Sequence, residues 1–411
     1  MTVCLPGIRV LDLSRILAGP WATQLLADLG AEVIKVERPG DGDDTRSWGP
    51  PFVSGVDEGD LFSAYYLAAN RGKKSIVVDL SSQEGREIIA TLARASDIIV
   101  ENFSISVAKR LGFDYARLSA INPRLIYCSI TGFGQTGPHK DRPGYDLLVQ
   151  AMGGLMSITG APDGEPMKVG VAVADLLTGL YATVAILAAL NERHSSGLGQ
   201  HIDLALLDVQ IATLANQGMN YLASGKAPAR SGNTHPNIVP YQAFATCDGH
   251  IVVGVGNDVQ FARLAAVLGL PALSTDPRFA TNTARVTNRA ALIPILSKMI
   301  GSWPKRDLLR ALEEERIPAG PINAMDEVFA DPQIEARGLV IEQHLADGQP
   351  PVKIRANPIR LSRTPVRYDK PPPRLGAHTE EILRDEFGMP QSKLAELIEQ
   401  GVVARNGERT R

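Results

Sequence analysis

The sequence has few cysteines, little net charge and no long uninterrupted hydrophobic run. Its 411 residues include three cysteines, none of them in a C-x-x-C pair. This is typical of a reducing compartment and disfavours both a disulfide framework and a structural zinc site. The formal net charge is −3, whereas binding of nucleic acid depends on many uncompensated basic residues. We therefore expect no nucleic-acid partner.

Signals for export and membrane insertion are also lacking. The first residues, MTVCLPGIRVLDLS, contain no basic start followed by a long apolar core. The longest apolar stretch, Leu176–Leu190, is interrupted by Thr, Gly and Tyr and is short for a bilayer span. We predict a cytoplasmic protein without a membrane partner.

Several common catalytic signatures are missing. The loop ERPGDGDDTR, which follows a predicted strand, contains neither G-x-x-x-x-G-K-[ST] nor G-x-G-x-x-G, which disfavours a phosphate-binding loop or a dinucleotide site of the usual kind there. Its seven histidines form no H-E-x-x-H, and no G-x-S-x-G occurs. We expect no metal site and no tightly bound cofactor.

A regular alternation of strand and helix patterns fills the first 135 residues. Ile8–Ser14 is a short apolar run of the kind buried on both faces of a sheet, and an amphipathic helix that ends at Gly30 follows it. AEVIKVE, SIVVDL, DIIVENF and LIYCSITGF repeat the strand pattern. This spacing predicts an α/β fold with a parallel, doubly wound sheet. Ligands of such sheets bind at the carboxyl ends of the strands, so LDLSRILAGP, VERPGDGDDTR and ENFSISVAKR are the first candidates for a site.

The second half of the chain suggests a smaller domain. The Gly/Pro/Asn-rich loop GKAPARSGNTHPNIVP is the best domain boundary, and the runs YQAFAT and HIVVGV after it form a predicted hairpin. Helices are predicted near 259–268, 288–300 and 305–315. We expect a large domain over 1–224, an α+β domain over 225–330 and a C-terminal segment over 331–411.

One carboxylate stands out. The segment 169–194, VGVAVADLLTGLYATVAILAALNERH, is almost wholly apolar apart from Asp175, where the run becomes helical. Aspartate is a favoured helix N-cap, which is a sufficient structural explanation. A desolvated aspartate held there could also attack an acyl carbon as a covalent nucleophile, and the two interpretations are compatible.

The order and spacing of the motifs resemble class III CoA-transferases, the CaiB/BaiF group, from residue 7 to about residue 385. The matching segments are GIRVLDLS, AGP, LGAEVIKVE, GDGDDTR, NRGKKSIVVDL, DIIVENF, RLGF, GFGQTGP, the Asp175 segment and LGAHT. The resemblance implies a Rossmann-like large domain built from both ends of the chain, with the C-terminal segment returning to it. It also implies a homodimer of two subunits threaded through each other as interlocked rings.

The resemblance further implies a mechanism in which Asp175 attacks an acyl-CoA thioester. CoA and acyl-CoA are then substrates, and an aspartyl anhydride and an aspartyl-CoA thioester are intermediates. The matching CoA-site positions are Leu17 and Ala18 beside the thiol end, Arg38 for the phosphates, Asp79, Leu80 and Ser81 near the adenine, Asn102, Phe103 and Arg110 along the nucleotide, and Gly144, Tyr145 and Asp146 close to the reacting centre. From the sequence pattern alone, Arg38 could equally be a solvated loop arginine.

Three alternative functions remain open. Racemases of α-methylacyl-CoA share the fold, but they carry histidine in a G-H-D motif where this chain has Tyr145, and a phenol with a pKa of about 10 is a poor base. Transferases of the formyl-CoA:oxalate type carry glutamine where this chain has Leu17. A CoA-binding protein without turnover would have no need of Asp175.

The middle domain most resembles transferases that use succinyl-CoA as donor and a dicarboxylate such as glutarate as acceptor. The second carboxylate of such substrates calls for an arginine or a nest of backbone N–H groups. Arg285, Arg289 or amides around Asn237 could supply it, and ordinary surface charges are the alternative for both arginines.

Overall fold

The computed structural model describes residues 2–54, 61–345 and 350–405. Its contacts divide the chain into two compact units. The large unit combines residues 1–155, 169–219 and 335–411, and the small unit combines residues 156–168 and 220–334. Helices α7 (Leu155–Ile158), α10 (Ala215–Ser224) and α16 (Pro332–Ala336) cross the divisions.

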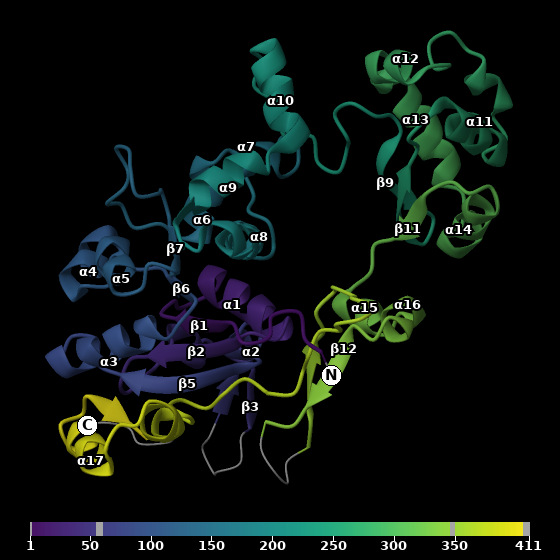
Figure 1. The fold of residues 1–411 in the computed structure, drawn as a ribbon. Coiled ribbons are helices and arrows are strands. Elements are labelled where there is room, and N and C mark those ends of the chain that lie inside the picture. Colours follow the sequence, from purple (N-terminus) through teal and green to yellow (C-terminus); the bar gives the residue numbers. More distant parts are fainter. Residues whose placement is uncertain (1, 55–60, 346–349, 406–411) are drawn as a thin grey trace. The chain divides into compact units, whose positions relative to one another are not determined.

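A seven-stranded sheet forms the centre of the large unit (Figure 1). Its strands, in spatial order, are β14 (Val403–Ala404), β5 (Lys73–Val78), β2 (Glu32–Glu37), β1 (Arg9–Asp12), β6 (Ile98–Glu101), β7 (Ile126–Thr131) and β8 (His201–Ala205). Every pair is parallel except β14 with β5. The predicted parallel α/β sheet is therefore confirmed.

The strand order reverses beside β1. From β1 the chain runs outward through β2 to β5 on one side, and it returns to the other side at β6 before continuing to β7 and β8. The loops that leave β1 and β6 therefore separate at this point. A crevice at such a reversal is the usual ligand site of an open parallel sheet.

Helices cover both faces of this sheet. The helices of the large unit are α1 (Ala18–Asp28), η1 (Asp44–Ser47), α2 (Ala64–Leu67), α3 (Gln83–Arg94), α4 (Ile105–Leu111), α5 (Tyr115–Ile121), α6 (Asp146–Met152), α8 (Val173–Ser196), α9 (Leu206–Ala212), η3 (Glu381–Glu386) and α17 (Gln391–Glu399). The hairpins β3 (Phe52–Ser54) with β4 (Leu61–Ser63) and β12 (Val340–Gln343) with β13 (Val352–Arg355) complete it.

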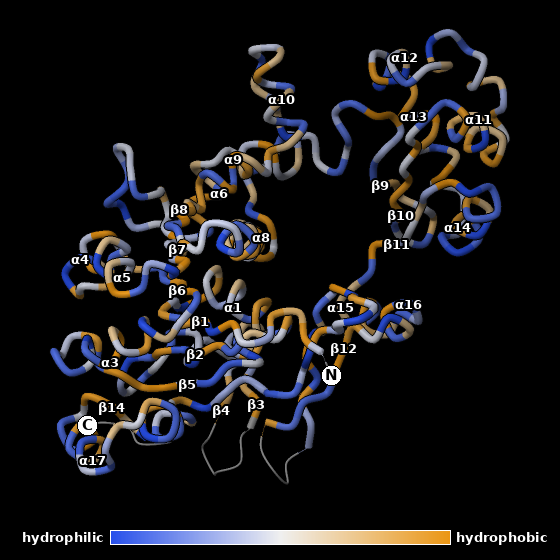
Figure 2. Tube along the Cα trace, viewed as in Figure 1, coloured by the Kyte–Doolittle hydropathy of each residue, from blue (hydrophilic) through white to orange (hydrophobic). Residues whose placement is uncertain are grey.

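Each face of the sheet has its own hydrophobic core, as expected for strands buried on both sides. One core joins sheet residues such as Leu11 and Ile76 to side chains of α3, η3 and α17. The other joins Val10 and Ile98 to α1 and α8. Figure 2 shows hydrophobic residues along β5 and α8. The C-terminal segment is thus part of the large unit's core, where η3 and α17 supply Ile382 and Leu394.

Helix α8 carries the apolar segment that contains Asp175. It spans 24 residues and is long and apolar enough to cross a membrane by length and composition alone, a test that the core helix of a soluble protein also passes. In this fold α8 packs against α1, β7 and β8. Gly179 permits the close approach to α1, because a Cβ atom there would lie 2.8 Å from the carbonyl oxygen of Ala18.

The small unit is an α+β structure with its own core. Strands β9 (Tyr241–Thr246), β10 (Gly249–Gly254) and β11 (Ala319–Pro321) form an antiparallel sheet, and β9 and β10 form the predicted hairpin. The helices are α11 (Asp258–Val267), η2 (Pro271–Ser274), α12 (Asn282–Thr287), α13 (Arg289–Ile300), α14 (Lys305–Glu314) and α15 (Met325–Phe329). Helices α11, α13 and α14 match the three predicted helices to within one residue at each end.

Candidate active site

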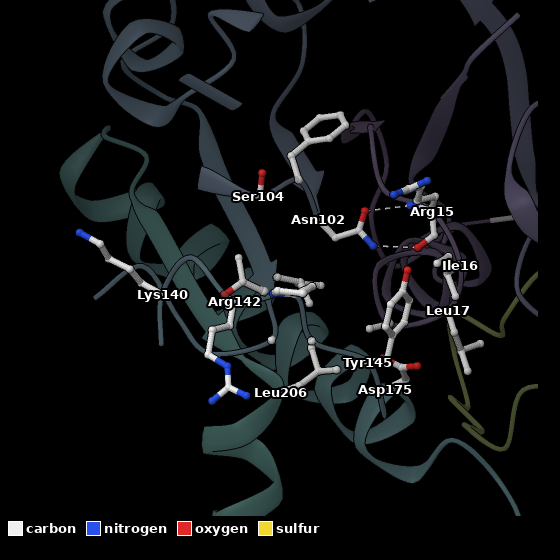
Figure 3. A pocket seen from close by; sticks show the side chains of 17 residues that line it. Arg15, Ile16, Leu17, Asn102, Ser104, Lys140, Arg142, Tyr145, Asp175 and Leu206 are labelled. Carbon is white, nitrogen blue, oxygen red and sulfur yellow. Dashed lines mark hydrogen bonds between the residues drawn. The ribbon is translucent and has the colours of Figure 1, made fainter. Parts of the chain in front are cut away.

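A pocket of about 210 Å³ opens at the point where the strand order reverses (Figure 3). Three loops line it, those following β1, β6 and β7, together with residues of α8 and α9. Small-molecule sites usually measure about 300–1,000 Å³, so this pocket is smaller than a typical complete site. Figure 3 shows Tyr145 and Asp175 toward the side of Leu17, with Lys140 on the opposite side.

The loop after β1 has a strained backbone. Ile16 has a φ of 73°, which costs a β-branched residue about 1–3 kcal/mol. Its N–H lies 3.3 Å from both carboxylate oxygens of Asp43. Lys35 Nζ contacts Asp43 Oδ2 at 2.8 Å and the carbonyl oxygen of Ser14 at 2.9 Å. These buried charges hold the loop at the mouth of the sheet.

Asn102 joins the loops that leave β1 and β6. Its Oδ1 accepts a hydrogen bond from the backbone N–H of Arg15 at 3.1 Å, and its Nδ2 donates to the carbonyl oxygen of Arg15 at 2.8 Å. Figure 3 shows both bonds. Glu101, which is buried beside it, accepts from the N–H of Phe103 at 2.8 Å. The Asn102 amide is therefore engaged with protein backbone on both of its polar atoms.

Asp175 lies in the first turn of α8 and lines the pocket. The prediction that it is the N-cap was wrong, because α8 begins at Val173 and Ala172 holds the cap position. The carboxylate that binds a free N–H of this helix end belongs to Asp146, whose Oδ1 accepts from Ala174 at 2.9 Å. Asp175 is thus left to face the pocket.

The electrostatic surroundings of Asp175 disfavour its ionised form. Burial and, secondarily, the nearby carboxylate of Asp146 raise its pKa to about 7. Tyr65 lies close enough that Asp175 contributes to raising the pKa of its phenol, after burial. Within the described part of the chain, the Asp175 carboxylate has no hydrogen-bond or ion-pair partner. Perturbed carboxylates in pockets are characteristic of catalytic sites.

Six of the predicted CoA-site positions line this pocket with Asp175, namely Leu17, Ala18, Asn102, Phe103, Gly144 and Tyr145. The other six are not among its lining residues: Arg38, Asp79, Leu80, Ser81, Arg110 and Asp146. Arg38 follows β2, is half exposed and contacts Asp44 at 3.2 Å. Residues 79–81 follow β5. Their contacts with CoA stay a prediction.

Sequence reasoning missed several pocket residues, including the basic side chains Arg15, Lys140 and Arg142. Arg15 lies in a segment already singled out after β1, and its Nη1 contacts Asp44 at 2.9 Å. Lys140 and Arg142 lie in the loop after β7. Extending the rule on carboxyl ends to the strand LIYCSITGF would have pointed to this loop.

The suggestion that Arg285 binds a substrate carboxylate was wrong, as was its alternative, a surface charge. Its side chain is fully buried within the small unit. The guanidinium donates to the carbonyl oxygens of Val239 at 2.7 Å and Phe279 at 2.9 Å, and to Asp258 at 2.8 Å. Each of its three guanidinium nitrogens thus donates a hydrogen bond within the small unit, which makes Arg285 a structural residue. Arg289 donates to the carbonyl oxygen of His235 at 2.6 Å.

Comparison with known proteins identifies the class of enzyme. A family profile described as CoA-transferase family III matches residues 5–379. Succinate–glutarate CoA-transferase of Agrobacterium fabrum is 55% identical over 381 residues, which cover 93% of this chain and 95% of that protein. Succinyl-CoA:glutarate CoA-transferase of Homo sapiens is 46% identical, with 97% of this chain and 90% of that protein covered.

Structural similarity agrees with the sequence matches. A CaiB/BaiF family protein from Brucella suis superposes with a TM-score of 0.82 at 51% identity, covering 94% of this chain and all of that one. The predicted resemblance and enzyme class are thereby confirmed. The chain belongs to CoA-transferase family III.

Proposed function

We propose that this enzyme moves CoA from succinyl-CoA to a dicarboxylic acid such as glutarate, with Asp175 as the covalent nucleophile. The observation that carries the proposal is the position of Asp175 in the pocket, half-buried and without a cationic partner among the described residues. The substrates are suggested by the names of relatives at 55% and 46% identity.

The transfer would proceed in four steps. The Asp175 carboxylate attacks the thioester carbon of succinyl-CoA, which releases CoA thiolate and leaves a mixed anhydride. The thiolate attacks the aspartyl carbonyl, which releases succinate and leaves an aspartyl-CoA thioester. The acceptor carboxylate displaces the thiolate from that thioester to form a second anhydride. The thiolate then attacks the acyl carbonyl of the acceptor, so acyl-CoA leaves and Asp175 is restored.

The surroundings of Asp175 suit a nucleophile of this kind. A cation bonded to the carboxylate would lower both its basicity and its reactivity, and none occurs among the described residues. With a pKa of about 7, a large fraction of Asp175 is ionised at neutral pH while it remains more basic than an exposed aspartate. Pocket closure around it would exclude water, which would otherwise hydrolyse the anhydrides.

Tyr145 favours transfer over racemisation. A racemase needs a basic side chain to remove the α-proton, and a phenol stands at this position beside Asp175. The Leu17 side chain offers no polar contact to a small acid such as oxalate, so we favour a larger acceptor with an aliphatic chain. The residue that binds the distal carboxylate is then among the cationic pocket residues Arg15, Lys140 and Arg142.

A CoA-exchange assay tests the proposal. Succinyl-CoA would be incubated with a panel of mono- and dicarboxylic acids, and the acyl-CoA products would be identified by mass. We expect glutaryl-CoA among the main products of the wild type, and a loss of at least about 10⁴-fold in rate for Asp175→Asn, as for other covalent nucleophiles. Full activity in that variant, or exchange confined to oxalate and formate, would overturn the proposal.

We further propose that the enzyme is a homodimer. Helix α8 exposes Leu180, Tyr181 and Val184, with Val184 64% exposed, and such apolar surface is characteristic of a binding face. Sedimentation or light scattering would give the mass in solution. A mass near twice the 44.1 kDa of one chain is expected, and a monomer at micromolar concentration would contradict the proposal.

A further inference from the structure

Asp146, the first residue of α6, is bound at both of its oxygens. Its Oδ1 accepts from the backbone N–H of Ala174 in the first turn of α8 at 2.9 Å, and its Oδ2 accepts from Gln150 Nε2 at 2.6 Å. Gln150 is completely buried, and its Oε1 accepts from the N–H of Val169 at 2.9 Å. The Gln150 amide thus bridges Asp146 to the segment that leads into α8.

This arrangement fixes the direction from which Asp146 meets Asp175. Ala174 is the immediate neighbour of Asp175, so the bond to its N–H sets the orientation of the turn that presents the nucleophile. Gln150 supplies a neutral N–H donor, so it orients the Asp146 carboxylate without cancelling its charge. The bond at Val169 in turn fixes Gln150, since both ends of its amide are occupied.

We propose that Asp146 and Gln150 are positioning residues for Asp175. Gln150 holds the Asp146 carboxylate against the first turn of α8, and that carboxylate both fixes the turn and directs a like charge at Asp175. This inference rests on the proposed role of Asp175 as nucleophile. It gives Asp146 a role in the reaction although Asp146 does not line the pocket.

The charge of Asp146 shifts the pKa of Asp175 in a definite direction. Burial, followed by the Asp146 charge, raises the pKa of Asp175 to about 7, since a nearby like charge disfavours ionisation. Removing the Asp146 charge therefore lowers the pKa of Asp175 and extends the active form to more acid pH. The other titratable or charged side chains that line the same pocket or are coupled to Asp175 are Tyr65, Tyr145, Arg15, Lys140 and Arg142. None of these side chains is substituted when only Asp146 is changed.

The test compares pH profiles of kcat/KM for succinyl-CoA at saturating glutarate. Asp146→Asn keeps an oxygen for the N–H of Ala174 but removes the charge, and we expect its acid limb to move about one pH unit lower. Gln150→Leu keeps the charge but releases the carboxylate, and we expect kcat to fall about tenfold, with a smaller change in KM and no such displacement of the limb. Asp114→Asn is the matched control, because Asp114 caps α5 outside the pocket; its profile should equal that of the wild type.

An acid limb of Asp146→Asn that coincides with the wild type would overturn the inference. If this variant does not fold, Asp146→Ser also removes the charge and keeps a hydrogen-bond acceptor. The acid limb of its kcat/KM profile must then move to lower pH. Failure of both to fold, with Asp114→Asn unaffected, would show that Asp146 is purely structural and would equally overturn the inference. If the wild type lacks CoA transfer, or Asp175→Asn retains it, the proposed function itself fails, which is a distinct outcome.

Discussion

Asp43, which is buried, and Asp175, which is half-buried in the pocket, are both aspartates of the large unit, but their charged surroundings differ. Asp43 is in contact with the buried ammonium of Lys35 at 2.8 Å and accepts from the N–H and hydroxyl of Thr45. Burial opposes its ionisation, yet the charge and hydrogen bond of Lys35, together with the hydrogen bonds from Thr45, outweigh burial and hold the pKa of Asp43 well below its usual range. At Asp175 burial acts without a cation, and its pKa is raised to about 7.

We propose that this difference separates a structural carboxylate, Asp43, from a reactive one, Asp175. Asp43 is ionised at any physiological pH and is committed to holding the strained turn at Ile16. The Asp175 carboxylate has no hydrogen-bond or ion-pair partner among the described residues, so under the proposed mechanism its lone pairs are available to attack an acyl carbon. Burial alone therefore does not mark a catalytic carboxylate; the absence of a counter-charge in a pocket does.

The contrast between the two aspartates requires that Asp43 contribute to the stability of the fold. Asp43→Asn should lower the free energy of unfolding by about 3–5 kcal/mol, because it leaves the buried ammonium of Lys35 without its contacting anion. Thermal and denaturant unfolding measure the change. Asp276→Asn, which removes a partly exposed carboxylate paired with the exposed Arg278, should change the free energy of unfolding far less, and equal stability of the two variants would refute the structural role of Asp43.

A smaller effect of opposite sign is expected at Asp175. Its folded pKa of about 7 lies above the ordinary value of 3.8, so ionisation favours the unfolded chain as pH rises from about 4 to 7, and stability is lost over that window. Asp175→Asn should therefore be more stable than the wild type at pH 8, by about 1–3 kcal/mol, with no gain near pH 4. Melting temperatures at the two pH values check this, and a destabilised variant at pH 8 would mean that the carboxylate is well solvated or paired.

Much of this site could be predicted from the sequence because it follows local rules. The apolar runs of β1, β2, β5, β6 and β7 predict a parallel sheet, and the reversal of strand order places the loops after β1 and β6 at the ligand site. Asp175 was singled out because a carboxylate interrupts an apolar helix. Half of the CoA-site positions taken from the family resemblance line the pocket with it.

What could not be predicted depends on contacts between residues distant in the chain. The carboxylate that binds the start of α8 comes from Asp146, 28 residues before Ala174, and no local pattern records such a partner. Arg285 lies in a polar segment that resembles an exposed helix, yet carbonyl oxygens from two other segments and one aspartate converge on it. Whether a charged residue can be buried depends on partners of this kind. The partners of Arg285 lie outside α12, so the sequence of that helix does not indicate them.

Chemical trapping of the proposed nucleophile, Asp175, tests the central claim most directly. The enzyme would be mixed with succinyl-CoA and hydroxylamine, digested, and analysed by peptide mass spectrometry, with the turnover rate measured in parallel. Hydroxylamine attacks the aspartyl carbonyl of an anhydride or thioester and leaves a hydroxamate on the side chain. We predict that Asp175 carries this hydroxamate, with the enzyme inactivated in proportion. An unmodified Asp175 in enzyme that loses activity, or a hydroxamate on another carboxylate, would contradict the account.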